Sequence, residues 1–118
     1  MATRCQIGFY KDTKNLNNFE VLIYRHWDGY PEGVIPEILP ILKRFDKGRG
    51  LGDIEYASAW LVKKLKKDYL NVGISKDFHG DIEYLYAILK DRIEVYEIVK
   101  WGEENINKRF EKIDTIKI

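Results

Sequence analysis

The sequence predicts an α+β domain, with an antiparallel sheet of four to five strands and two helices packed on one face. Strand patterns stand at both ends of the chain, and helical apolar periodicity fills the middle. This order of strand, strand, helix, helix, strand, strand, with one further strand near the C-terminus, suits helices segregated onto one face of a sheet. With 118 residues, 45% of them hydrophobic, we expect a single domain over residues 1–118.

The first two strands are expected in residues 4–10 and 19–24. Cys5, Ile7 and Phe9 alternate with other residues, and the second segment is rich in aromatic and β-branched side chains. The polar, asparagine-rich residues between them are typical of a hairpin loop, so the two strands are predicted to be antiparallel. Cys5 is the single cysteine and cannot close an intramolecular disulfide, so it is interpreted as a small buried hydrophobe.

The first helix is expected among the apolar residues between positions 34 and 45, which recur at helical spacing. Pro36 can occupy a first helical turn, whereas Pro40 would remove a backbone hydrogen bond from a helix interior. We therefore predict either a kink or a short helix that begins close to Ile38. The glycines between positions 48 and 52 then break the helix.

The second helix is predicted from residue 53 to about residue 69. Asp53 is the expected cap, and lysines near the C-terminal end complement the helix dipole. Gly73 is expected to help mark the stop. The predicted apolar stripe consists of Ile54, Ala57, Trp60, Leu61 and Leu65.

A second β-hairpin is expected from residues 82–89 and 93–99, because apolar residues alternate on both sides of Lys90-Asp91. The tail from Trp101 begins as a polar segment and ends in spaced apolar residues. It predicts a short helical turn followed by a last strand.

Charge and targeting signals exclude several function classes. Lysine plus arginine (20) nearly cancels aspartate plus glutamate (19), so a net charge of +1 gives no global attraction to nucleic acid or to an anionic membrane. The chain shows no signal peptide pattern and no run of about 18 apolar residues, and we expect a cytoplasmic protein without a membrane partner. Its lysine, glutamate and isoleucine content suits a heat-adapted source, and an AT-rich genome gives the same bias.

The most informative segment is residues 26–33, His-Trp-Asp-Gly-Tyr-Pro-Glu-Gly. A core does not need this mixture of rings, carboxylates and turn formers, so the segment is predicted to be a surface that binds another molecule. A structural alternative is that Asp28 caps a turn, His26 bonds a carbonyl and Trp27 covers the core. The candidate ligand-binding residues are His26, Trp27, Asp28, Tyr30 and Glu32.

This segment resembles the motif of an uncharacterised family of small proteins from bacteriophages and other mobile elements. The resemblance includes Thr3-Arg4 in the first strand and the later Gly-Asp-Ile-Glu-Tyr-Leu-Tyr sequence at Gly80 to Tyr86, and it spans roughly residues 3–100. It implies one small domain of viral or mobile-element origin. It implies no activity.

A second polar cluster precedes and enters the third predicted strand, and it consists of Asp77, His79, Asp81 and Glu83. If the sheet places it beside His26, the combined imidazoles and carboxylates could bind a divalent metal or share acid and base roles, with His79 and Asp81 as candidate metal ligands. The spacing lacks the tight signature of a zinc site, and a solvated strand face explains it equally well.

Basic residues mark a candidate phosphate site. Lys47 and Arg49 flank a glycine-rich loop that leads into the second predicted helix, where a phosphate could bind, although such loops often serve only as connections. Residues 43–67 carry eight basic side chains against three acidic ones, and residues 81–104 carry seven acidic against three basic. This polarity could dock a phosphate-rich ligand, drive association of subunits, or reflect ordinary solvated helix faces.

Three hypotheses of function follow, and the sequence fixes no reaction because it lacks a nucleophile elbow, a Walker loop and a dinucleotide fingerprint. The first is a non-enzymatic protein, without a cofactor, that binds a nucleotide-like ligand or a protein partner through residues 26–33 and counters host defence. The second is a metal-dependent phosphodiester hydrolase, such as a nuclease or cyclic-nucleotide phosphodiesterase. Its ligands or acid and base would be Asp28, Glu32, His79 and Asp81, with Lys47 or Arg49 on phosphate. The third is a structural or regulatory module that forms a homodimer.

Overall fold

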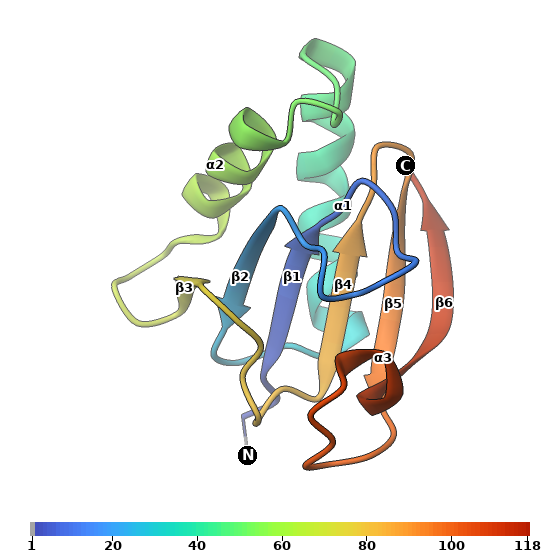
Figure 1. Cartoon of the computed structure of the whole chain (residues 1–118). Coiled ribbons are helices and arrows are strands. Elements are labelled where there is room, and N and C mark those ends of the chain that lie inside the picture. Colours follow the sequence, from blue (N-terminus) through green and yellow to red (C-terminus); the bar gives the residue numbers. More distant parts are fainter. Residues whose placement is uncertain (1) are drawn as a thin grey trace.

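The computed structural model describes residues 2–118 and contains one six-stranded mixed sheet (Figure 1). The strands are β1 (Cys5–Phe9), β2 (Val21–Arg25), β3 (Val72–Ser75), β4 (Tyr84–Ile88), β5 (Arg92–Ile98) and β6 (Phe110–Lys117). Their order in the sheet is β3-β2-β1-β4-β5-β6. Each neighbouring pair is antiparallel except β1 and β4, which are parallel. The α+β class is confirmed, while the predicted strand number and fully antiparallel pairing are wrong.

The parallel pair arises because the two predicted hairpins, β1–β2 and β4–β5, lie side by side through their first strands (Figure 1). Both hairpins are confirmed. All five residues of β1 and the last four of β4 are buried, as expected for central strands covered on both faces.

The first helix, α1 (Pro31–Gly48), begins seven residues before Ile38, so the alternative of a short helix that starts near Ile38 is wrong. Pro31 occupies the first turn, where a missing N–H costs nothing. Pro36 and Pro40 lie inside the helix, and each removes one backbone hydrogen bond. Every fourth residue of an apolar stripe is buried and holds α1 against the sheet; these residues are Val34, Ile38 and Leu42.

The second helix, α2 (Ile54–Leu65), ends four residues before the predicted end at Tyr69. The buried Asn71 sets this end, because its side-chain N–H donates to the Leu65 carbonyl at 2.8 Å and its oxygen accepts from the backbone N–H of Lys67 at 3.3 Å. The chain then turns into β3, which pairs with β2 and contains Gly73. Strand β3 was not predicted from the sequence, and Gly73 lies within this strand and does not mark the stop of α2.

The two long helices lie on one face of the sheet, as predicted (Figure 1). The β1–β2 loop and the short α3 (Ile106–Arg109) cover the opposite face, where a second apolar cluster is buried. The predicted helical turn and last strand in the tail are confirmed as α3 and β6. Cys5 is fully buried as expected, and this burial raises the pKa of its thiol to about 12. No helix of residues 2–118 is long and apolar enough to cross a membrane.

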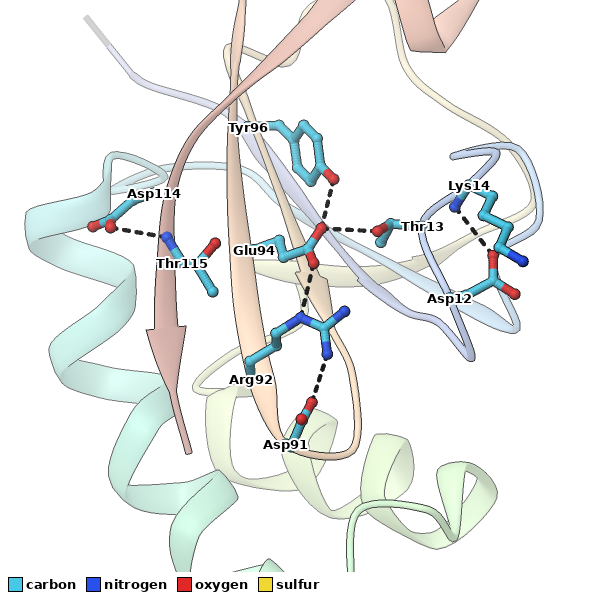
Figure 2. Close-up of polar contacts among 9 residues, drawn as sticks. All are labelled: Asp12, Thr13, Lys14, Asp91, Arg92, Glu94, Tyr96, Asp114 and Thr115. Atoms are coloured by element: carbon cyan, nitrogen blue, oxygen red, sulfur yellow. Dashed lines mark hydrogen bonds and ion pairs between the residues drawn. The ribbon is translucent and has the colours of Figure 1, made fainter.

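A buried carboxylate, Glu94, ties the β1–β2 loop to the sheet (Figure 2). Its oxygens accept hydrogen bonds from the Tyr96 hydroxyl at 2.7 Å, the Thr13 hydroxyl at 2.8 Å and the Arg92 Nε at 2.9 Å. Burial acts to raise the pKa of Glu94, but the three hydrogen bonds together outweigh it and lower the pKa below its ordinary value. Because these three hydrogen bonds all join groups of the protein itself and connect the β1–β2 loop to β5, we assign the network a structural role.

Candidate functional site

The backbone of residues 26–33, which joins β2 to α1, is fixed at its middle. The Gly29 N–H donates to the Thr3 carbonyl at 2.9 Å, and the hydroxyl of the buried Tyr86 donates to the Gly29 carbonyl at 2.7 Å. A Cβ at position 29 would lie 2.8 Å from the Thr3 carbonyl oxygen and 2.9 Å from the Cys5 nitrogen. Only glycine allows this close approach, so the loop is anchored to the start of β1.

The residue before this anchor has a left-handed backbone. Asp28 has a φ of 55°, which is uncommon outside glycine but tolerated by aspartate. Its carboxylate receives a long hydrogen bond of 3.4 Å from the Tyr30 hydroxyl. Such backbone conformations gather at ligand-binding segments, where surrounding structure over-determines them. Here the surrounding structure is the set of hydrogen bonds at Gly29.

The aromatic rings of the loop remain open to solvent. Trp27 is 37% exposed and Tyr30 is 40% exposed. The His26 ring packs edge-on against Trp27, with 5.5 Å between ring centroids. The structural alternative, in which Trp27 only covers the core, does not account for the 37% of this residue that is exposed to solvent.

A pocket of about 180 Å³ lies beside Trp27, between the loop and the end of α2. It is lined by Arg25, Trp27, Asp28, Glu37, Leu65, Lys67 and Asn71. Arg25 is neutralised by Glu37, with 2.6 Å between guanidinium nitrogen and carboxylate oxygen. Within residues 2–118, Lys67 has no carboxylate at ion-pair distance. Typical ligand pockets measure about 300 to 1,000 Å³, so this one encloses only a fragment, such as one ring or one phosphate.

The five predicted ligand-binding residues do not line one cavity. Trp27 and Asp28 line the pocket just described, whereas Glu32 lines an apolar groove of about 450 Å³ between α1 and strands β5 and β6. The centroid of the His26 ring lies 6.2 Å from that of the Tyr24 ring as well as 5.5 Å from that of Trp27. The loop therefore contributes residues to two different hollows, and His26 and Tyr30 line neither of them.

The second polar cluster comes close to the loop through Tyr24. The His79 ring stacks on Tyr24 at 4.2 Å, and Asp81 accepts a hydrogen bond of 2.9 Å from the Tyr24 hydroxyl. Asp81 also pairs with Arg4 at 3.3 Å. Burial, followed by the hydrogen bond to Asp81, raises the pKa of Tyr24 to about 12. Asp81 thus has two protein partners.

The polar cluster is held by a residue that the sequence analysis did not single out. Gln6 is fully buried in β1. Its side-chain oxygen accepts a hydrogen bond from the backbone N–H of His79 at 3.0 Å, and its side-chain nitrogen donates to the backbone carbonyl of Asp77 at 3.2 Å. Across residues 2–118, no three histidine, cysteine, aspartate or glutamate side chains are grouped so that they could hold a metal ion. Asp28 and Glu32, two of the ligands named in the hydrolase hypothesis, line different hollows.

The candidate phosphate residues lie at the far end of the helices. Asp53 is the N-cap residue of α2, as predicted, but its carboxylate pairs with Arg49 at 2.6 Å and makes no capping hydrogen bond. The Arg49 guanidinium also lies over the exposed Tyr56 ring at 4.1 Å. Lys47 is exposed. Trp60, predicted as part of the apolar stripe, is only half-buried beside Arg49.

No family model matches the chain, and neither the curated proteins nor the solved structures contain a significant match to it. Function is therefore inferred from the residues and their arrangement.

Proposed function

We propose that the chain is a binding protein whose recognition surface is the loop of residues 26–33, and that its ligand is nucleotide-like. This proposal depends on one observation: hydrogen bonds hold the loop backbone in place while its aromatic rings remain exposed. Both the N–H and the carbonyl of Gly29 are hydrogen-bonded, and Trp27 and Tyr30 are partly exposed to solvent. Rings held in place before binding lose little conformational entropy when a ligand stacks on them.

The pocket beside Trp27 supports the choice of ligand. A planar base can stack on Trp27, and Asp28 on the pocket lining can accept hydrogen bonds from base N–H groups. Lys67, on the same lining, supplies the positive charge for a phosphate. A nucleotide combines these features. Sequestration of a signalling nucleotide would suit the viral or mobile-element origin that the motif implies.

The Trp27→Ala variant tests this proposal in a thermal-shift screen of mononucleotides, dinucleotides and cyclic nucleotides. A ligand at about 100 times its Kd should stabilise the natural protein by about 2.7 kcal/mol, which raises Tm by roughly 10 °C. Loss of stacking in Trp27→Ala should weaken binding about tenfold or more.

Trp101→Ala is the matched control, because Trp101 is exposed in the β5–α3 loop and is not among the residues that line the pocket. This variant should bind as the natural protein does. Failure of every nucleotide to raise Tm, or equal binding by Trp27→Ala, would contradict the proposal.

A protein partner is the second candidate, and a separate observation favours it. Tyr69 and Leu70, in the turn that carries the pocket residues Lys67 and Asn71, are 86% and 65% exposed. Exposed large side chains of this kind beside Trp27 are typical of the centre of a protein contact surface. Leu70→Ser separates the two candidates, since it would weaken a protein contact but leave nucleotide affinity unchanged.

A further inference from the structure

The exposed side of α2 carries lysines around an aromatic ring. Residues 60–67 contain four lysines and no acidic residue. Trp60, Lys63 and Lys64 share one helix face because they are three and four positions apart. The amino groups of Lys63 and Lys64 lie 5.3 and 4.6 Å from the centroid of the Trp60 ring. Ring and charges therefore form one surface.

At the start of α2 this surface continues into a hollow. The hollow has a volume of about 280 Å³ and is lined by Arg44, Phe45, Gly48, Arg49 and Trp60. Arg49 is paired with Asp53, but Arg44 has no carboxylate at ion-pair distance within residues 2–118. The hollow thus joins an aromatic ring to an uncompensated guanidinium, and it offers both to one ligand.

At the other end of α2 the surface reaches the recognition loop. Lys67 lies just beyond the helix and lines the pocket that contains Trp27. Leu65, the last residue of α2, lies five positions after Trp60, which is roughly 7 to 8 Å along the helix axis, and Lys67 follows two residues later. Lys63, Lys64 and Lys67 therefore follow Trp60 along the chain toward the pocket that contains Trp27.

We propose that this basic stripe, defined as Arg44, Arg49, Trp60, Lys63, Lys64 and Lys67, binds single-stranded nucleic acid that extends from the nucleotide held at Trp27. The inference rests on the proposed function and names a longer ligand for the same site. Proteins that bind single strands combine basic side chains along the phosphates with aromatic rings on which successive bases stack. A duplex fits less well because its bases are already stacked on one another. The net charge of +1 makes this attraction local.

Fluorescence anisotropy with a labelled single-stranded oligothymidylate, a duplex of the same length and a labelled mononucleotide tests the inference. The single strand should bind more tightly than the other two probes. If about four phosphates are neutralised, its affinity should fall about 50-fold between about 50 and about 200 mM salt. The double variant Lys63→Ala/Lys64→Ala should reduce the slope of log K against log salt by about 1.4.

Trp60→Leu keeps an apolar side chain on α2 and removes the ring, so it should weaken single-strand binding about fivefold or more. Lys14→Ala/Lys108→Ala is the matched charge control, because both lysines are exposed and belong to the β1–β2 loop and α3 on the opposite face. This control should bind as the natural protein does. Circular dichroism establishes that each variant is folded before its affinity is compared.

The outcomes separate this inference from the proposed function. If the single strand binds no more tightly than the mononucleotide or the duplex, or if Trp60→Leu binds it unchanged, the basic stripe is not the site. Mononucleotide binding that still depends on Trp27 would then leave the proposed function standing. Single-strand binding that depends on Trp60 but not on Trp27 would contradict both the proposed loop site and the inference that the strand extends from it. Absence of binding by all probes would contradict both.

Discussion

Glu94→Ala is expected to lower the free energy of unfolding by about 3 kcal/mol, the largest effect expected for a buried polar residue of this protein. The substitution leaves the hydroxyls of Tyr96 and Thr13 without their acceptor in a buried environment. It also detaches the β1–β2 loop from β5, because Thr13 loses its hydrogen bond across 81 positions of sequence. Urea unfolding at neutral pH, compared with that of the natural protein, measures this loss.

Tyr96→Phe is the control for Glu94→Ala, since it removes one donor and leaves the carboxylate two others. It should cost only about 1 kcal/mol. A similar loss in the two variants would contradict the view that the carboxylate is the centre of the network.

The same residue predicts how stability depends on pH. The folded-state pKa of Glu94 lies below its ordinary value of 4.5, because the hydrogen bonds outweigh burial. A carboxyl group of this kind contributes stability that is fully present above the unfolded-state pKa and is lost as pH falls through the folded-state pKa. The stability difference between the natural protein and Glu94→Gln should therefore shrink below about pH 4.5. A difference that stays constant down to about pH 2 would contradict this assignment.

Gly29→Ala is expected to have the second large effect, a destabilisation of about 3 kcal/mol. The new Cβ would lie 2.8 Å from the Thr3 carbonyl oxygen and 2.9 Å from the Cys5 nitrogen. Both are backbone atoms, which cannot rotate away as a side chain can. Any shift that relieves the clash stretches the hydrogen bonds of Gly29 to Thr3 and Tyr86. Chemical denaturation gives the change in the free energy of unfolding.

Gly48→Ala provides the comparison for Gly29→Ala. A Cβ at this position, in the last turn of α1, meets no atom within 4 Å. This variant should be neutral or more stable by about 0.5 kcal/mol, because alanine favours the helix. If the two alanine variants have the same stability, the recognition loop is not locked at Gly29.

Local sequence patterns predicted the hairpins and the pairing within each of them, because turn length and alternation are local properties. They could not predict that β1 pairs with β4, since nothing near either strand encodes a partner about 80 positions away. The end of α2 depended on Asn71, whose side chain reaches back six residues to Leu65. The start of α1 depended on Pro31, which the sequence analysis treated only as part of the motif.

The loop that we propose as the recognition surface was chosen from its residue types, but the exposure of its rings could not be predicted from them. The backbone of this loop is set by the close approach of Gly29 to Thr3, a contact between segments distant in sequence. Trp60, which we place in the proposed basic stripe, was predicted to be a core residue because an apolar ring at helical spacing favours that interpretation. The signal that could have revealed it was the pair of lysines three and four positions later, on the same helix face.

Amide chemical shifts recorded during a nucleotide titration test most directly whether residues 26–33 form the recognition surface. We expect the largest changes at the amides of this loop and at the indole N–H of Trp27, with the indole of Trp101 unaffected. Shifts confined to other parts of the chain, or none at saturating nucleotide, would show that the locked loop and its open rings do not bind this ligand.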